Sequence, residues 1–360
     1  MSGPPGGKFV LPQELDVRPG HGFVMRGWDF TRADVEQAIR GHRMLNPSME
    51  LASNACPWSC DFCFTESPDN PAGLKRRLAG EMSLEERLTL VDDAAALGAR
   101  TINFVGAGEP TIDPDFWTIV ERIASRGMVP ILYTEAAQRL RDRAFATRLH
   151  DLGATIVVKV NSLANAAYQN EVVRGSGGKV GARADNYTQF RNEAVDLLME
   201  LGFNRCEPTR LAFDTILCGR NYSEIIDLHR WTRSRNIFTL GVAYLPSGRS
   251  SDKPEDAITR QQLFEMYEQI AKIDANEFGF KHATRFPYGG GVPCTIRGTG
   301  LYTKITGPVF DCPGELIPLG NLRHETLAQI WERARPITES FDGGCKPRDE
   351  AWRKRGEFEV

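Results

Sequence analysis

The stretch CPWSCDFCF, residues 56–64, places three cysteines within eight residues of an aromatic-rich segment. Cys56, Cys60 and Cys63 have the spacing Cys-x3-Cys-x2-Cys, with no fourth cysteine or histidine close by. This spacing fits zinc poorly, because a structural zinc ion almost always takes four protein ligands. Three thiolates can instead hold three irons of a four-iron cluster and leave one iron open to a small molecule. The stretch therefore predicts an iron–sulfur site, with zinc or a buried group of thiols as alternatives.

Outward from this loop, apolar runs rich in β-branched residues alternate with amphipathic stretches whose apolar residues recur every three or four positions. The runs predict strands at residues 49–54, 101–106, 129–134, 155–160, 210–217 and 236–244. Ser83 and Asp113 are expected to cap helices between them. Six strands with helical crossovers predict a parallel α/β sheet, and the length suits a partial (β/α)6 barrel of the TIM type.

Composition beyond this core divides the chain into three expected parts. Residues 1–48 form an N-terminal extension with a helix capped by Thr31, residues 49–250 form the barrel core, and residues 251–360 form a smaller α+β domain. This last part begins with a linker and a helix, and continues with a hairpin at residues 300–314 and a short helix. We expect the pocket at the carboxyl ends of the core strands, where parallel α/β folds bind ligands.

Bulk properties indicate an ordinary globular protein without nucleic-acid or membrane partners. The 360 residues carry a net charge of −3, and no apolar run approaches the roughly 18 residues needed to span a bilayer. The first residues lack the layout of a signal peptide, so a cytoplasmic location is expected. Disulfides are rare there, which favours metal binding or catalysis for the eight cysteines.

The cysteine spacing resembles the Cys-x3-Cys-x-aromatic-Cys signature of the radical S-adenosylmethionine (SAM) superfamily, with Phe62 at the aromatic position. GAGEP, residues 106–110, resembles the family's Gly-Gly-Glu-Pro motif, with Ala107 in place of one glycine. The resemblance covers residues 49–250 and implies a [4Fe–4S] cluster on the three cysteines with SAM on the open iron. The reduced cluster would split SAM into methionine and a 5′-deoxyadenosyl radical, with electrons from a flavodoxin- or ferredoxin-type protein.

The resemblance also implies a set of cofactor contacts. Phe62 would pack near the adenine, and the GAGEP turn would bind the methionyl amine through Gly106, Ala107, Gly108 and Glu109. Ribose and carboxylate contacts are expected at the ends of the third and fourth strands, from Thr134, Glu135, Lys159, Asn161 and Ser162. Polar residues at strand ends are also common as plain loop residues.

The late cysteines, Cys294, Cys312 and Cys345, resemble those of the twitch domain, which binds a second, auxiliary [4Fe–4S] cluster near the substrate. The pattern departs from that domain because Lys346, Pro347 and Arg348, and no second cysteine, follow Cys345. Asp311, Glu315, His324, an open iron or a substrate group are candidates for the fourth ligand. The alternative is three scattered buried thiols.

With a twitch domain and this length, the sequence resembles carbohydrate and aminoglycoside epimerases and dehydrogenases of antibiotic biosynthesis. Cys218 ends the fifth predicted strand, where its thiol is expected to face the pocket and donate a hydrogen atom, which favours epimerisation of a sugar, aminocyclitol or oligosaccharide. A buried apolar role for Cys218 and a dehydrogenase using the auxiliary cluster are the alternatives. A peptide maturase and a non-catalytic iron–sulfur protein are further ones. Tyr133, Tyr244 and Tyr288 are expected in the pocket.

Overall fold

The computed structural model describes residues 22–52, 55–64, 79–163, 165–174, 180–245, 248–250, 253–282, 284, 287–315, 317–339 and 343–357. Residues 1–21, part of the expected N-terminal extension, therefore lie outside the described residues. The expected helix capped by Thr31 is present as α1 (Arg32–Arg40), where Thr31 and Asp34 form a reciprocal capping box.

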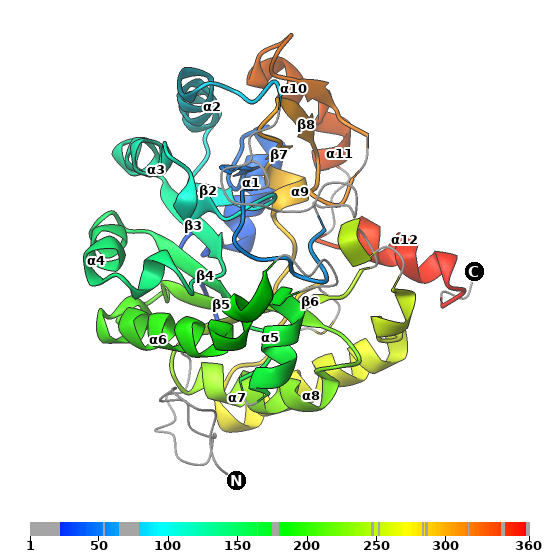
Figure 1. Cartoon of the computed structure of the whole chain (residues 1–360). Coiled ribbons are helices and arrows are strands. Elements are labelled where there is room, and N and C mark those ends of the chain that lie inside the picture. The colour runs from blue at the N-terminus through cyan, green and yellow to red at the C-terminus, as the bar shows by residue number, and fades with distance from the viewer. Residues whose placement is uncertain are drawn as a thin grey trace.

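Six parallel strands, paired in chain order, form the core of the sheet (Figure 1). They are β1 (Ser48–Met49), β2 (Thr101–Phe104), β3 (Val129–Thr134), β4 (Thr155–Lys159), β5 (Leu211–Leu217) and β6 (Phe238–Ala243). All six predicted strands are confirmed, although β1 is much shorter than the predicted run at residues 49–54. The partial-barrel α/β architecture predicted from the sequence is confirmed as well.

The C-terminal hairpin continues this sheet on the side of β1. β7 (Tyr302–Thr303) pairs in parallel with β1, and β8 (Pro308–Phe310) and β9 (Gly320–Asn321) follow in antiparallel pairing. The resulting order is β6-β5-β4-β3-β2-β1-β7-β8-β9. One sheet therefore runs from the predicted core into the predicted C-terminal region.

Helices cover the outer face of the parallel strands, as Figure 1 shows. They are α2 (Leu84–Ala96), α3 (Phe116–Ser125), α4 (Arg143–Asp151), α5 (Ala166–Arg174), α6 (Tyr187–Glu200) and α7 (Ile225–Arg233). Ser83 caps α2 through a capping box with Glu86, as predicted. The prediction for Asp113 is wrong: α3 begins after Asp115, and Asp113 instead pairs with Arg87 at 3.2 Å.

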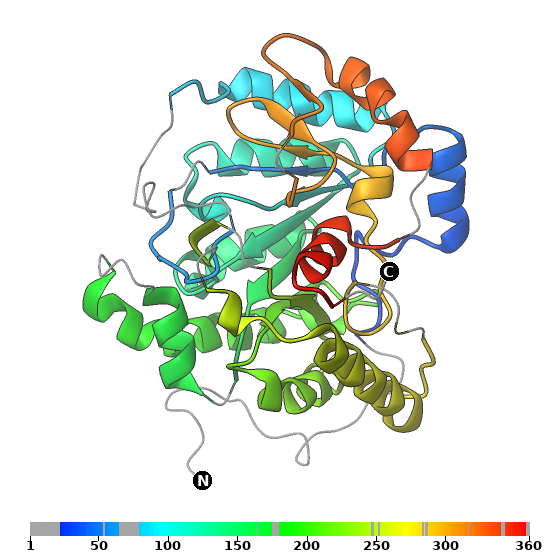
Figure 2. The ribbon, with the colours of Figure 1, turned by 90° about the vertical axis from the view of Figure 1, so that its right-hand side faces the viewer.

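Later helices surround the hairpin and the open side of the sheet. They are α8 (Arg260–Glu277), α9 (Ile296–Thr299), α10 (Leu327–Arg333), α11 (Arg335–Glu339) and α12 (Lys346–Lys354). Figure 2 shows α12, in red, between the hairpin and α8. The helix α12 follows directly on Cys345, which occupies its N-cap position.

The period-two alternation of the strands separates two apolar layers. Outward side chains such as Ile156, Val158 and Phe213 join the large core beneath the helices. Inward side chains form a smaller cluster at the start of the strands, made of Met25, Ile131, Val157, Ala212, Phe238 and Leu240. Further along the same inward face the side chains become polar, and the site begins there.

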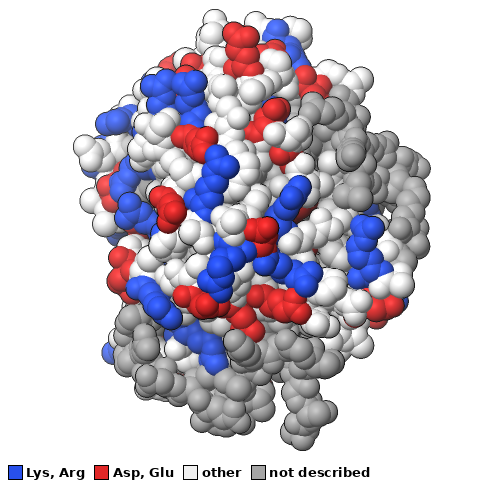
Figure 3. All heavy atoms as spheres, turned by 60° about the vertical axis from the view of Figure 1, so that its left-hand side comes forward, with Lys and Arg blue, Asp and Glu red and all other residues white. Residues whose placement is uncertain are grey.

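The outer helices are joined to one another by ion pairs. Arg126 of the α3 C-terminus pairs with Asp92 of α2 at 2.8 Å, and Arg143 of α4 pairs with Glu200 of α6 at 2.8 Å. On the face drawn in Figure 3, basic and acidic side chains are correspondingly interspersed. In the part of the chain that the structure describes, no helix has the length and apolar character needed to cross a membrane.

Candidate functional site

A cavity of about 400 Å³ opens at the carboxyl ends of the strands. Its wall combines inward side chains of β3 to β6 with the loops that follow the strands. Both predicted groups of cysteines contribute to this one cavity, and the six are Cys56, Cys60, Cys63, Cys294, Cys312 and Cys345. The fold thus brings together two cysteine groups that are separated by more than 200 positions in the sequence.

The early cysteine loop has no regular structure of its own and is fixed by its neighbours. The backbone N–H groups of Ser59 and Asp61 donate to the last carbonyls of α5, those of Val173 and Val172, at 2.9 Å each. On the opposite side, the Arg249 N–H donates to the Cys63 carbonyl at 3.0 Å. These contacts hold the three thiols at the cavity wall.

The early thiols are suited to a metal cluster by their environment. All three are free cysteines, and burial, followed by the charge of Cys63, raises the pKa of Cys60 to about 12. Burial also raises the pKa of Cys56 well above its ordinary value. Thiolates formed here therefore require a compensating cation, which the irons of a cluster provide.

The thiols around the cavity are not arranged as ligands of a single metal ion. Among the described residues, no three His, Cys, Asp or Glu side chains converge on one point as ligands of one metal ion do. A four-iron cluster differs from such a site because each thiolate binds a separate corner iron. The donor set around the cavity, thiols in groups of three, fits a cluster.

The GAGEP turn follows β2 and packs tightly against the start of the cysteine loop. Gly106 and Gly108 have φ values of 135° and 78°, and a Cβ on Gly108 would lie 2.9 Å from the carbonyl oxygens of Ala52 and Ala55. Gly106, Gly108 and Glu109 line the cavity. Ala107 is buried and does not line it. Glycine is thus required for close backbone packing at this turn.

Glu109 is held by the protein itself. Its carboxylate accepts hydrogen bonds from the Thr111 hydroxyl at 2.6 Å, from the Thr134 hydroxyl at 2.8 Å and from two backbone N–H groups, those of Thr111 at 3.2 Å and of Glu135 at 3.0 Å. Glu109 therefore fastens the end of β2 to the end of β3. Its oxygens are already engaged where the sequence predicts a contact to an ammonium group.

The neighbouring Glu135 has a carboxylate oxygen available to a ligand, whereas both oxygens of Glu109 already accept hydrogen bonds. Glu135 is buried at the cavity wall beside the Trp58 indole, where Oε2 accepts from the Ala137 N–H at 2.8 Å and Oε1 has no hydrogen-bond partner of good geometry among the described residues. Burial, and then the charge of Glu109, raises the pKa of this carboxyl well above its usual range. A ligand ammonium placed here would satisfy the unpaired oxygen and favour the ionised carboxylate.

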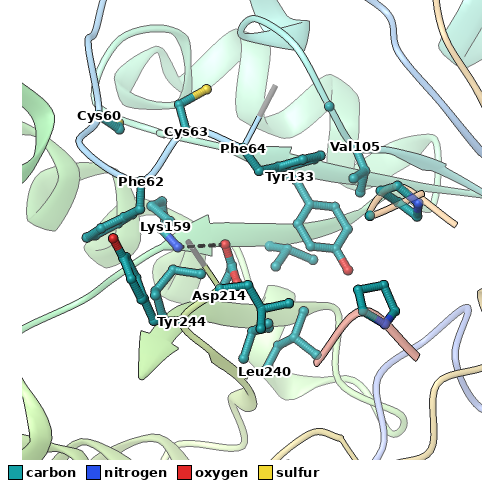
Figure 4. A pocket seen from close by; sticks show the side chains of 18 of the residues that line it. Cys60, Phe62, Cys63, Phe64, Val105, Tyr133, Lys159, Asp214, Leu240 and Tyr244 are labelled. Carbon is teal, nitrogen blue, oxygen red and sulfur yellow. Dashed lines mark hydrogen bonds and ion pairs between the residues drawn. The ribbon is translucent and has the colours of Figure 1, made fainter. Parts of the chain in front are cut away.

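An ion pair crosses the inner wall of the cavity. Lys159 of β4 and Asp214 of β5 are register partners, and Lys159 Nζ lies 2.9 Å from Asp214 Oδ2 (Figure 4). The ring of Phe62 lies 5.4 Å from the same Nζ, and the ring of Tyr244 packs edge-on at 6.3 Å from that of Phe62. Phe62 and Lys159 therefore sit together on one side of the cavity.

Asp214 was not identified as a site residue from the sequence. Its signal is the alternation in LAFDTIL, where Asp214 interrupts an inward face formed otherwise by apolar residues. Tyr133, Tyr244 and Tyr288 line the cavity as predicted. Two more basic residues that the sequence did not single out, Arg249 and Arg297, line it too.

The late cysteines come from three separate segments. Cys294 precedes α9, Cys312 follows β8, and Cys345 begins α12. Burial raises the pKa of Cys345 to about 11. Two residues predicted as possible fourth ligands are already paired, Asp311 with Arg297 at 3.1 Å and Glu315 with Lys346 at 2.7 Å. The third, His324, is exposed and does not line the cavity.

Three further predicted residues, besides Ala107 and the candidate fourth ligands, lie outside the cavity. Contrary to expectation, the Cys218 thiol is fully buried behind β5, 3.4 Å from the Tyr168 hydroxyl and 3.5 Å from Asn221 Oδ1. The chain turns immediately after β5 ends at Leu217, so the alternation that places Asp214 inward no longer applies. Asn161 and Ser162 are likewise buried, where their backbone N–H groups donate to Gln169 of α5.

Comparisons with known proteins agree with this geometry. A family model described as the radical SAM superfamily matches residues 51–232. The chain is 34% identical to a GTP 3′,8-cyclase of Aeromonas hydrophila subsp. hydrophila over 113 residues, 31% of this chain and 32% of the relative. It is 28% identical to the mycofactocin maturase MftC of Mycobacterium tuberculosis (strain CDC 1551 / Oshkosh) over 270 residues, 72% of this chain and 62% of the relative.

The chain thus spans less than two thirds of the length of both curated relatives. Among solved structures, Streptococcus suis SuiB bound to precursor peptide SuiA superposes with a TM-score of 0.58 at 16% identity. That match covers 88% of this chain and 76% of SuiB. At this identity the match concerns the fold, which is the same α/β arrangement.

Proposed function

Because the chain belongs to the radical SAM superfamily, we propose that it uses SAM to oxidise a hydroxyl-bearing carbon in a small polar substrate of the sugar or aminocyclitol type. When bound, SAM and two [4Fe–4S] clusters would supply the one-electron chemistry: reductive cleavage of SAM, and acceptance of the electron left on the substrate. Membership of this superfamily implies one [4Fe–4S] cluster and SAM. The second cluster and the class of substrate are proposed in addition.

The observation that carries the proposal is the lining of the cavity by both groups of cysteines. Cys56, Cys60 and Cys63 would hold the SAM-binding cluster, while the late cysteines would hold an auxiliary cluster that faces the same space. An oxidation would call on both groups of cysteines, since the early group would hold the cluster that supplies the electron for SAM cleavage and the late group one that accepts the electron left on the substrate. In this proposal residues 49–250 are the core, and residues 251–360 supply a twitch-type auxiliary unit.

The protein's own residues would bind and orient the reactants. Phe62, with Lys159 at 5.4 Å from its ring, would pack near the adenine. The unpaired Glu135 Oε1 would accept from the methionyl ammonium, beside the backbone of the glycine turn. Tyr133 and Tyr288, on the remaining wall, would contact a hydroxyl-rich substrate.

Asp214 is the candidate proton acceptor. Conversion of a secondary alcohol to a ketone removes one hydrogen atom from carbon, one proton from oxygen and one electron. Lys159 pairs with Oδ2 of Asp214, while Oδ1 has no hydrogen-bond partner among the described residues. This oxygen would accept the hydroxyl proton. Cys294, Cys312 and Cys345 would hold the auxiliary cluster that accepts the electron, with an external flavodoxin- or ferredoxin-type protein as the redox partner.

A second candidate is the oxidative modification of a peptide. It is favoured by the similarity to a relative named as a mycofactocin maturase over 72% of this chain. The same two-cluster cavity would serve that reaction, because it too is an oxidation. The substrate, and not the arrangement of the site, separates the two candidates.

Epimerisation with Cys218 as hydrogen-atom donor, predicted from the sequence, has less geometric support. A donor must reach the substrate radical on the face opposite to the one attacked. The Cys218 thiol lies outside the cavity and is hydrogen-bonded to Tyr168 and Asn221. We therefore prefer the oxidation.

The test is anaerobic turnover of the reconstituted enzyme with SAM, dithionite and a panel of cyclitols, aminocyclitols and amino sugars in deuterium oxide. The expected product is two mass units lighter than its substrate, carries no solvent deuterium at the reacting carbon and forms with an equal amount of 5′-deoxyadenosine. A product of unchanged connectivity that gains one deuterium would instead establish epimerisation. A parallel panel of short synthetic peptides tests the second candidate.

A further inference from the structure

Asp61 lies inside the early cysteine loop, between Cys60 and Phe62, and its side chain is turned away from the cavity. Cys60, Phe62 and Cys63 line the cavity and Asp61 does not. Its carboxylate is buried and pairs with Arg220 and Lys253 at 3.5 Å each. We propose that Arg220 is a positioning residue for the SAM-binding cluster, because it neutralises Asp61 directly behind the cysteine loop.

Arg220 is set in place by a capped turn after β5. The Cys218 N–H donates to Asn221 Oδ1 at 3.0 Å, and the Asn221 amide donates to the carbonyls of Ile216 at 2.8 Å and Asn161 at 2.9 Å. The Gly219 N–H donates to the Asp256 carbonyl at 3.0 Å. The side chain of Asn221 thus closes a turn that points Arg220 outward from the end of the strand.

The guanidinium of Arg220 meets several elements that pack against the loop. It lies 5.3 Å from the ring centre of Tyr168 and pairs with Asp256 at 3.1 Å and with Glu171 of α5 at 3.8 Å. The same helix α5 accepts the backbone N–H groups of Ser59 and Asp61. Arg220 therefore connects the cysteine loop with α5 and with the segment that precedes α8.

Charge explains why this position requires a cation. A [4Fe–4S] cluster with three thiolates is anionic, and it becomes more so on reduction. Without Arg220, Asp61 would keep the ion pair with Lys253, but the net negative charge one residue from Cys60 would increase and oppose that reduction. Outer contacts of this kind tune a metal site and commonly change its affinity or activity by about 10- to 100-fold when they are removed.

This assignment explains the burial of Cys218 without a role in catalysis. Its thiol fills the space between Tyr168 and Asn221, the two residues that contact Arg220 and fix its turn. Cys218 is in this view part of the support of the cysteine loop from behind. The inference goes beyond the reaction proposed above and rests only on its placement of the SAM-binding cluster.

The experiment uses charge rescue in the reconstituted full chain, with Arg220→Met, Asp61→Asn and the double variant. The matched control is the outer ion pair of Arg126 and Asp92, changed to Met and Asn in the same three combinations. Measurements are iron per chain, the midpoint potential of the EPR signal that responds to added SAM, and the rate of SAM cleavage.

Arg220→Met should lower the midpoint potential and slow SAM cleavage by about tenfold, while Asp61→Asn should raise the potential. The double variant should return close to wild type, and the control set should not differ from it. If both single variants lose the EPR signal and the double variant does not restore it, the inference is overturned, because the loss would then come from disturbed packing and not from charge. A wild-type protein with no SAM-responsive signal would instead refute the cluster placement itself.

Discussion

The two groups of cysteines reach the same cavity by opposite routes. The early group is one continuous loop, and its spacing is set by the local sequence. The late group is assembled from the segment before α9, the end of β8 and the start of α12, so its spacing exists only in the folded chain. A contiguous motif can be identified from sequence alone, whereas a dispersed set depends on the tertiary structure that gathers it.

The largest expected effect separates these groups by function. Replacing Cys56, Cys60 and Cys63 together with Ala should abolish formation of 5′-deoxyadenosine, because these three thiols lie in the loop against which the GAGEP turn packs, where SAM is expected to bind. Iron bound by the late group should remain. Liquid chromatography with mass spectrometry of the reduced protein with SAM measures the first quantity, and an iron assay measures the second. Cleavage that persists in this variant would contradict the assignment.

The reciprocal change tests whether the late group is a site at all. The wild-type chain should carry about eight irons in two four-iron clusters, and Cys294, Cys312 and Cys345 changed to Ala should leave roughly half. This variant should still cleave SAM but form no oxidised product, since the acceptor for the substrate electron is missing. If the wild type holds only about four irons and the late variant loses none, the late group is a set of buried thiols.

A smaller effect is expected at the wall between the two groups. Asp214→Asn removes the proton acceptor without changing side-chain size, so oxidised product should form about 100-fold more slowly. Cleavage of SAM should continue, uncoupled from product. The matched variant Asp92→Asn, on the outer helices, should match wild type in both quantities. Equal loss of cleavage and product in Asp214→Asn would show that the pair holds SAM and not the substrate.

The smallest effect is expected at the cysteine that belongs to neither group and lies directly after β5. Cys218→Ala should leave product formation within about twofold of wild type and reduce the free energy of unfolding by about 1 kcal/mol, for the lost packing and the weak thiol hydrogen bonds. Chemical denaturation and the turnover assay measure these quantities. If the variant instead keeps the stability of wild type and still abstracts hydrogen from the substrate, but no longer forms the inverted product, the epimerase interpretation would be restored.

Most of the fold was predictable because its signals are local. Runs such as VPILYT and TIVVKV form strands because apolar and β-branched residues dominate them, and Ser83 and Thr31 begin helices through capping boxes. The first strand was predicted too long, because the chain leaves the sheet after Met49 to enter the cysteine loop. The helices α5 and α12 were not predicted, since both carry polar residues on much of their surface.

The site was predictable only where a residue's role depends on its neighbours in sequence. Gly106, Glu109 and the early cysteines line the cavity as their motifs predict. Cys218 and Asn161 were expected there from their position at strand ends, but the direction of a side chain after a strand depends on the turn that follows. Asp214 shows the converse, because its importance arises from pairing with Lys159 on the adjacent strand.

The pairing of β7 with β1 makes the first and last thirds of the chain mechanically interdependent. The backbone N–H groups of Ser48 and Glu50 donate to the carbonyls of Leu301 and Thr303, and the buried Glu50 carboxylate accepts from the Tyr302 hydroxyl at 2.5 Å and the Ile305 N–H at 3.0 Å. Truncation after residue 250 would expose the edge of the sheet at β1. It would also remove the two hydrogen bonds that Tyr302 and Ile305 donate to the buried Glu50 carboxylate. A shortened chain of this kind is therefore a candidate for aggregation rather than a minimal one-cluster enzyme.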